Sequence, residues 1–204
     1  MSVYSYVLND CLYLNITNRC NNACTFCIKF KSRHFEDKHE LWLGKEPSAQ
    51  EVLKSIEEDI AKHRQIVFCG YGEPLIRLET VKEIARTLKE KGAVIRIDTD
   101  GQANLFHGRN ILPELAGLAD EIYISLNAHD SATYQKLCRP VFGEKAFDAV
   151  KNFAEEANNI VPSVVLTAVE LPSVDMEKCR AIAEKIGIGF KLRPYYEKNY
   201  QPVQ

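Results

Sequence analysis

The chain has 204 residues, of which 46% are hydrophobic and 26% charged, the composition of an ordinary globular domain. A formal net charge of −2 gives no electrostatic reason to expect nucleic-acid or membrane binding. No apolar run approaches the roughly 20 residues of a membrane span, and the first residues lack the basic and apolar regions of a signal peptide. Seven cysteines without an export signal predict a reducing, cytoplasmic setting.

Two strand-like runs open the chain, at 3–8 and 12–17, with a turn at Asn9-Asp10 between them. Directly after them stand Cys20, Cys24 and Cys27, spaced C-x3-C-x2-C within eight residues. Cysteine thiolate is the usual ligand of iron–sulfur clusters, and a four-iron cluster normally has four such ligands. Three close cysteines would leave one iron open to another molecule.

Two other readings of the three cysteines stay open at this point. They could be half of a zinc site or a chance grouping. Zinc sites favour paired C-x2-C units, and the chain has no second such unit, because its other cysteines are scattered singly at positions 11, 69, 138 and 179. A disulfide framework is not expected, since seven is an odd number and nothing marks secretion. The pattern therefore favours a cluster.

The stretch from 28 to 47 shows no regular pattern, and its first part is basic. It is either a solvated surface loop or a loop over the mouth of a site that contacts substrate or a partner, because long loops in compact domains are often functional. His34 and His39 could ligate a metal, but two histidines five positions apart in a polar loop are weak evidence.

A capping box at Ser48 predicts a helix that ends near His63. A short buried strand at 66–69 then leads into Gly70-Tyr71-Gly72-Glu73-Pro74. Glycines present bare backbone, which lets a ligand approach closely, and the carboxylate of Glu73 can accept an ammonium group. An ordinary glycine-rich turn before a helix is the alternative reading.

The rest of the chain alternates between helices and strands. We predict helices at 78–90, 111–118, from 130 to 137, 146–157 and 175–186, and strands at 94–98, 121–128, 164–170 and 190–193. Six strands alternating with helices indicate a parallel sheet. Because a full eightfold barrel needs about 250 residues, we expect an α/β fold that is a partial, open (β/α)6 barrel of TIM type.

We expect one domain over 1–204, with a leading strand and turn at 1–11, an irregular tail at 195–204 and no domain for an auxiliary cluster. Barrel folds place their chemistry at the carboxyl ends of the strands. By alternation Arg96 and Asp98 share one face of their strand, as do Ser125 and Asn127. A polar substrate pocket could be supplied by Arg96, Arg139 and Arg193.

The cysteine spacing, with Phe26 before the last cysteine, resembles the signature of the radical S-adenosylmethionine (radical SAM) enzymes. The resemblance implies that Cys20, Cys24 and Cys27 hold a [4Fe-4S] cluster whose fourth iron is chelated by SAM. It also implies that an electron from the cluster cleaves SAM to a 5′-deoxyadenosyl radical, which abstracts hydrogen from a substrate. Phe26 would then pack near the adenine.

Three later segments resemble motifs of the same family. Gly72-Glu73-Pro74 resembles the G-G-E-P turn that binds the SAM amino group. The segment 98–101 resembles the D-T-N-G segment of glycyl-radical activating enzymes, which lies near the SAM carboxylate and sometimes a monovalent cation; Asp100 stands where asparagine is expected. The segment 125–128 resembles the motif that binds the ribose. The cofactor contacts implied by the resemblance are Phe26, Gly70, Tyr71, Gly72, Glu73, Pro74, Asp98, Thr99, Ser125, Asn127 and Leu192.

Within the superfamily the chain resembles the small TatD-associated radical SAM proteins, through segments 14–18, 68–74, 107–110 and 125–128. That resemblance implies an association with TatD-type hydrolases and a reduced flavodoxin or ferredoxin as electron donor. The substrate stays open, and a small molecule or nucleotide is the first expectation. The alternatives are an activase that plants a glycyl radical on a partner protein and a non-enzymatic cluster- or zinc-binding protein.

Overall fold

The computed structural model describes residues 3–36, 38–56 and 59–195. Its main sheet has seven strands in the order β1-β2-β5-β6-β7-β8-β9. β1 pairs antiparallel with β2, and every later neighbour pair is parallel. The strands are β1 (Ser5–Leu8), β2 (Cys11–Leu14), β5 (Gln65–Phe68), β6 (Ile95–Thr99), β7 (Glu121–Ser125), β8 (Ser163–Val169) and β9 (Gly189–Arg193). The predicted open arrangement of six parallel strands with a leading strand is confirmed.

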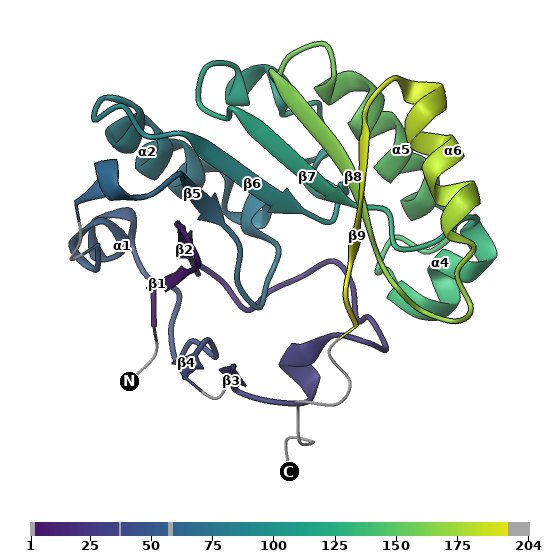
Figure 1. Ribbon diagram of the computed structural model, residues 1–204, viewed down its shortest axis with the longest axis horizontal. Helices are drawn as coiled ribbons and strands as arrows, with labels where there is room; N and C mark the ends of the chain where they lie inside the picture. The colour runs from purple at the N-terminus through teal and green to yellow at the C-terminus, as the bar shows by residue number, and fades with distance from the viewer. Residues whose placement is uncertain (1–2, 37, 57–58, 196–204) are drawn as a thin grey trace.

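Helices connect the parallel strands and lie on one side of the curved sheet, as Figure 1 shows for α2, α4, α5 and α6. The short segments β3 and β4 lie on the other side. The α-helices are α1 (Ala49–Lys54), α2 (Leu78–Lys89), α3 (Ala103–His107), α4 (Ser131–Cys138), α5 (Lys145–Ala157) and α6 (Met176–Ile186). The 3-10 helices are η1 (Ile28–Phe30), η2 (Ile60–Lys62), η3 (Pro74–Arg77) and η4 (Leu112–Leu115).

Because side chains alternate along each strand, the sheet has one apolar face and one face that carries polar side chains. One set of strand residues joins the core beneath the helices: Leu12, Leu14, Ile66, Phe68, Ile95, Ile97, Ile122, Ile124, Leu166 and Ala168. The intervening set includes Tyr13, Arg96, Asp98 and Tyr123, and the strand register brings Tyr13 level with Arg96 through Val67, and Asp98 level with Tyr123. Since alternate residues face opposite sides of a strand, the polar set lines the inner, concave face. We call this space the lumen.

Some predicted boundaries are wrong. The helix expected from Ser48 to His63 ends at Lys54, because Ser55 turns toward the leading strand: its carbonyl accepts a hydrogen bond from the hydroxyl of Ser5 at 2.6 Å. Residues 57–58 lie outside the described residues. The helix α3 was not expected, and it ends at Gly108, whose φ of 64° favours glycine.

The segment 28–47 was expected to be irregular, and it contains η1 and a short antiparallel pair, β3 (His34–Phe35) and β4 (His39–Glu40). The ring of His39 lies 5.0 Å from that of Tyr6 on β1. At the other edge of the sheet, Lys31 donates a hydrogen bond to the hydroxyl of Tyr195, just after β9. The segment therefore reaches from the β1 edge to the β9 edge on the luminal side.

Among the described residues, no helix combines the length and the apolar character that crossing a membrane requires. The expected irregular tail at 195–204 falls almost entirely outside the described residues, which end at Tyr195.

Candidate active site

The loop that carries the three cysteines follows β2 and docks on the end of α4. The backbone N–H of Ala23 donates to the carbonyl of Cys138 at 3.0 Å, and that of Thr25 donates to the carbonyl of Leu137 at 2.8 Å. Arg139, which ends α4, has a φ of 47°, and this left-handed turn frees those carbonyls for the loop. The cysteine loop is thus held by backbone hydrogen bonds to an element more than 100 positions away.

The three cysteine residues are each partly buried. The thiol of Cys20 lies 3.9 Å from a carboxylate oxygen of Asp100, and burial, followed by that carboxylate, raises the pKa of Cys20. A hydrogen bond with Cys138, followed by burial, raises the pKa of Cys24, and burial raises that of Cys27. The thiols are therefore protonated in the metal-free chain, and a bound cation would be needed to stabilise their thiolates.

This donor set fits a cluster better than a single ion. Within the described residues, no group of three or more His, Cys, Asp or Glu side chains is close enough to hold one metal ion. A cubane cluster takes its three thiolates on three different irons, so it requires wider spacing than a zinc ion does. Soft thiolate ligands from one short loop suit iron–sulfur chemistry.

Glu73 is the hub of the turn that follows β5. It is 2% exposed. Its carboxylate accepts hydrogen bonds from the backbone N–H of Leu75 at 2.9 Å, the hydroxyl of Thr99 at 2.9 Å and the backbone N–H of Asp100. Burial, followed by the nearby Asp100, raises the pKa of Glu73 well above its usual value, and burial raises that of Asp100 to about 6. Glu73 therefore ties the end of β5 to the end of β6, and its expected contact with the SAM amino group stays a prediction.

The glycines of this turn serve close packing of the chain on itself. A Cβ on Gly72 would lie 2.4 Å from the carbonyl oxygens of both Thr17 and Arg19, and a Cβ on Gly70 would lie 2.0 Å from the side-chain oxygen of Asn15. Real Cβ atoms do not approach so closely. The absence of a side chain at these positions is therefore required by the protein's own packing against Asn15 and the loop after β2, and the expected close approach of a ligand to this backbone stays a prediction.

Asp98 joins two of the predicted substrate arginines. Arg96 donates to one of its carboxylate oxygens at 2.9 Å and Arg193 donates to the other at 2.9 Å. The side chain of Asp98 was expected near SAM, and the structure commits it to these two cations on the luminal face. Arg139 is not part of this group, since it is exposed at the end of α4.

A cavity of about 440 Å³ occupies the lumen, within the size range of small-molecule sites. We call it the luminal pocket. It adjoins the candidate cofactor site, because Gly70 and Tyr71 of the turn line it, as does Ile28, which follows Cys27. Its lining also includes Tyr6, Tyr13, Arg96, Tyr123, Lys191 and Arg193.

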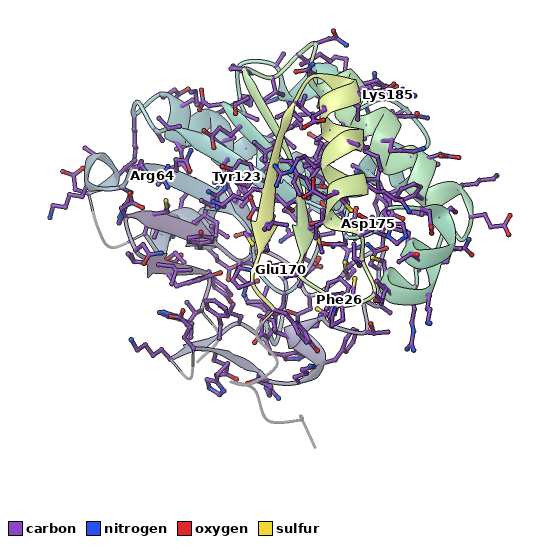
Figure 2. The ribbon with its side chains drawn as sticks, turned by 45° about the vertical axis from the view of Figure 1, so that its right-hand side comes forward. Phe26, Arg64, Tyr123, Glu170, Asp175 and Lys185 are labelled. Carbon is purple, nitrogen blue, oxygen red and sulfur yellow. The ribbon has the colours of Figure 1, made fainter. Side chains whose placement is uncertain are left out.

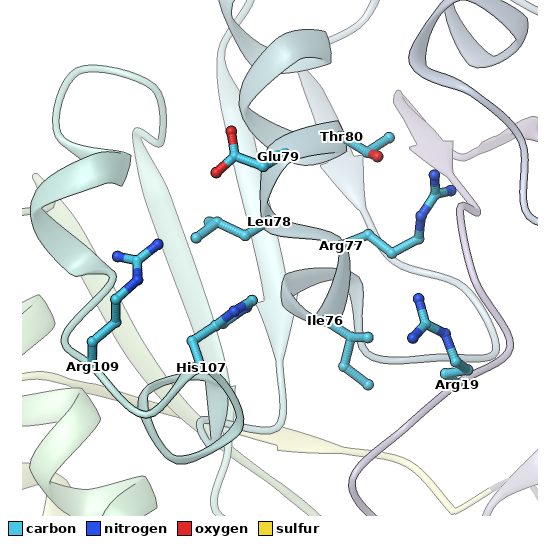
Figure 3. A pocket seen from close by; sticks show the side chains of 8 residues that line it. All are labelled: Arg19, Ile76, Arg77, Leu78, Glu79, Thr80, His107 and Arg109. Carbon is cyan, nitrogen blue, oxygen red and sulfur yellow. The ribbon is translucent and has the colours of Figure 1, made fainter.

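A second cavity, of about 400 Å³, lies beside the amino end of α2 (Figure 3). Its arginines are already engaged. Arg19 pairs with Glu46 at 2.7 Å, Arg77 donates to the carbonyl of Pro47 at 2.6 Å, and Arg109 pairs with Glu114. These cations hold the structure together and leave little capacity for a ligand.

The remaining predicted cofactor residues lie on or near the ends of the strands. Asn127 has a φ of 52°, and its side-chain oxygen accepts from the backbone N–H of Val169 at 3.2 Å, which leaves its amide group for other contacts. Ser125 pairs in register with Thr167. Phe26 is partly buried against the main core, and Figure 2 labels it at the same end of the molecule as Glu170, which follows β8. The other two are Pro74, which begins η3, and Leu192, which is 37% exposed on β9.

Sequence reasoning missed a buried polar network beneath the cysteine loop. The side chain of Gln102 donates to the side-chain oxygen of Asn22 at 2.9 Å and to the hydroxyl of Tyr134 at 3.1 Å, and Asn22 also donates to Tyr134 at 3.1 Å. All three residues are buried. The only signal in the sequence is the pair of asparagines between Cys20 and Ala23, which does not reveal its partners.

Comparison with known proteins settles the family. The family model for the radical SAM superfamily matches residues 14–186. The chain belongs to the radical SAM superfamily. Members of this superfamily use a [4Fe-4S] cluster, SAM and a reductant, so the expected cofactors follow from membership.

Two curated relatives illustrate the similarity. One is a tungsten-containing aldehyde ferredoxin oxidoreductase cofactor-modifying protein from Pyrococcus furiosus, 30% identical over 168 residues, which cover 78% of this chain and 43% of the relative. Another is a GTP 3′,8-cyclase from Paenarthrobacter nicotinovorans, 27% identical over 186 residues, which cover 88% of this chain and 48% of the relative. This radical SAM chain spans less than half the length of these relatives.

Among solved structures, HydG, a maturase of the [FeFe]-hydrogenase, superposes with a TM-score of 0.58 at 14% identity, covering 95% of this chain and 46% of HydG. That likeness supports the fold alone. The resemblance to TatD-associated radical SAM proteins is not addressed by these relatives and stays a prediction.

Proposed function

We propose that this radical SAM enzyme binds its [4Fe-4S] cluster through Cys20, Cys24 and Cys27 and binds SAM beside it at the carboxyl ends of β5, β6 and β7. The observation that carries the proposal is the convergence of three turns. The thiol of Cys20 meets Asp100 at 3.9 Å, and Glu73 accepts hydrogen bonds from Thr99 and Asp100. The family's expected cluster and SAM motifs thus come together although 80 positions separate their ends.

The chain's own residues position the site. Docking on α4 orients the cysteine loop, and the buried Glu73 fixes the turns after β5 and β6 relative to each other. Asn127, held through Val169, presents an amide suited to a ribose hydroxyl. When bound, the reduced cluster supplies the electron that cleaves SAM to a 5′-deoxyadenosyl radical. The luminal pocket beside this site would receive the substrate from which hydrogen is abstracted.

The supply of electrons and the target are part of the same proposal. A reduced flavodoxin or ferredoxin would serve as electron donor. A small-molecule target is favoured over a glycyl-radical partner protein, because a cavity of about 440 Å³ with both polar and aromatic lining residues lies next to the Gly70–Pro74 turn. Among the described residues we identify no surface that would specifically bind a glycyl-radical enzyme or a TatD-type hydrolase.

The test is anaerobic reconstitution with iron and sulfide, followed by chromatography for 5′-deoxyadenosine after addition of dithionite and SAM. We expect formation of 5′-deoxyadenosine by the wild-type protein. A protein that carries a full cluster and yields no 5′-deoxyadenosine would refute the enzymatic proposal.

The ligand assignment has a matched control in Cys138, which hydrogen-bonds Cys24 and is fully buried. Cys24→Ala should lose the cluster, whereas Cys138→Ala should keep the iron content of the wild type. Equal iron contents in the two variants would show that Cys24 is not a ligand, and loss of iron from Cys138→Ala alone would move the assignment to Cys138.

A further inference from the structure

The luminal pocket carries more positive than negative charge. Arg64 is paired with Asp10 at 2.8 Å, so that pair is neutral. Asp98 is a single carboxylate shared by Arg96 and Arg193. Lys191 forms no ion pair with any described residue. About two positive charges are therefore left uncompensated on the wall of the pocket.

The two arginines on Asp98 play different parts. Arg96 is 6% exposed, and each of its three side-chain nitrogens already donates a hydrogen bond: besides Asp98 it donates to Gln65 at 3.2 Å and to the hydroxyl of Tyr13 at 3.1 Å. Arg193 donates to Asp98 through one of its nitrogens, and its side chain is 34% exposed. Arg96 is thus held in place and orients Asp98, whereas Arg193 has further N–H groups that can donate hydrogen bonds to a ligand.

Lys191 stands next to Arg193 along the rim. Its ammonium lies 5.7 Å from the centre of the Tyr123 ring, and the guanidinium of Arg96 lies 4.6 Å from the same ring. Such cation–π contacts position a cation without neutralising its charge. Lys191 and Arg193 therefore offer adjacent donors to an anionic group, and such charge-assisted hydrogen bonds are the strong ones.

The wall opposite these cations is aromatic. Tyr6 and Tyr13 stack with ring centres 5.3 Å apart, and Tyr6 belongs to a buried apolar cluster with Leu41 and Tyr71. All four residues line the pocket. A flat or apolar portion of a ligand would lose water against this wall, which is favourable. Figure 2 labels Tyr123 and Arg64 on one side of β9, away from Lys185 on α6.

We infer that the substrate is a small organic anion, a carboxylate or phosphate monoester, whose charged group binds Lys191 and Arg193 and whose flat apolar portion lies against Tyr6 and Tyr13. This inference rests on the proposed function for its meaning as a substrate site. The binding site itself stands on the geometry of the luminal pocket. Its volume of about 440 Å³ limits the ligand to small molecules.

The experiment is calorimetric titration of the cluster-loaded protein without reductant, so that no turnover is needed. The probes are phenyl phosphate, benzoate, inorganic phosphate and the uncharged benzyl alcohol. Phenyl phosphate or benzoate should bind more tightly than benzyl alcohol and inorganic phosphate, and the stronger of the two tells whether the anion is a phosphate or a carboxylate. The single tryptophan, Trp42, packs against the apolar side-chain cluster that contains Tyr6 and Tyr71. A change in its fluorescence is therefore a second readout of ligand binding.

Variants separate the pocket from general surface charge. Lys191→Met should weaken binding of the preferred anion about tenfold, since it removes a charge-assisted hydrogen bond. Lys185→Met on α6, outside the luminal pocket, should leave binding unchanged. Equal binding of benzyl alcohol and the anions, or an unchanged affinity in Lys191→Met, would overturn the inference. Because no SAM cleavage is measured, this outcome is independent of the assay for 5′-deoxyadenosine.

Discussion

At the scale of single residues, the glycines after β5 have a structural role in a turn that resembles a cofactor-binding motif. The turn that follows β5 passes so close to the loop after β2 that only hydrogen fits at Gly70 and Gly72. That contact is what brings Glu73 to the backbone of Arg19, whose carbonyl accepts from the Glu73 N–H at 2.7 Å. The glycines thereby set the separation between the cysteine loop and the Gly70–Pro74 turn.

Gly72→Ala should destabilise the metal-free chain by about 2 kcal/mol or more, because the new methyl group would have to displace backbone rather than a flexible side chain. Urea unfolding measures the change. Gly44→Ala is the matched control, since a Cβ there meets nothing within 4 Å. A Gly72→Ala variant as stable as Gly44→Ala would show that the two loops do not pack as described.

At the scale of elements, an ion-pair network joins α2 to the segment before β7. Glu114 on η4 pairs with Arg109 and with Lys82 of α2, the latter at 2.6 Å. The hydrogen bond from Arg109, followed by that from Lys82, lowers the pKa of Glu114 to about 2. Its unfolded-state pKa is about 4.3. A carboxyl with a depressed folded pKa stabilises the fold above the unfolded pKa and loses that contribution as the pH falls through the folded pKa.

Glu114→Gln should therefore lower the free energy of unfolding at pH 6, and the difference from wild type should shrink below about pH 4.3 and vanish near pH 2. The effect is modest because Arg109 is exposed and Glu114 is partly exposed, so salt screens their interaction. Urea titrations in low salt at several pH values measure it, with Glu83→Gln on the exposed face of α2 as control. A difference that stays constant from pH 6 to pH 3 would contradict the assignment.

Several side chains hold the segment 28–47 against the stretch between β2 and Cys20, and Asn18 contributes two of the hydrogen bonds. Asn18 donates to the carbonyl of Leu43 at 2.8 Å and accepts from its N–H at 3.1 Å. Asn18→Ala should free the segment and speed tryptic cleavage at its basic residues severalfold, because proteases cut chain that opens locally. Mass spectrometry locates the cuts. Asn159→Ala, an exposed position after α5, should cleave at the wild-type rate, and an equal rate in Asn18→Ala would show that other contacts suffice.

At the scale of the whole molecule, the sequence predicted a parallel sheet in a partial open barrel, because short apolar strands alternate with helices along the chain. Alternation also placed Arg96 with Asp98 on one face. Alternation could not predict which side chains of different strands contact each other across the sheet. That Arg193 shares Asp98, or that Lys191 lies over Tyr123, depends on the register of strands β6 to β9, and register is fixed by packing beyond the reach of local pattern.

In the candidate site, too, local motifs could be predicted from the sequence and contacts between distant residues could not. The cysteines, the Gly72–Pro74 turn and the strand ends are visible as motifs, because each is local. The roles of Asn15, Asn18 and Gln102 are invisible, since each side chain serves backbone or side-chain groups distant in sequence. Arg139 was predicted as a substrate group because a guanidinium can bind a carboxylate or phosphate through two hydrogen bonds. It lies at the exposed end of α4, outside the luminal pocket, and its role stays a prediction.

The central claim is that the cluster on Cys20, Cys24 and Cys27 keeps one iron open for SAM. Electron paramagnetic resonance of the reduced, cluster-loaded protein tests it most directly, by recording spectra before and after SAM is added. The claim predicts a cluster signal that changes when SAM binds and that is lost in Cys24→Ala. A wild-type signal that SAM leaves unchanged, or an identical signal in Cys24→Ala, would contradict it.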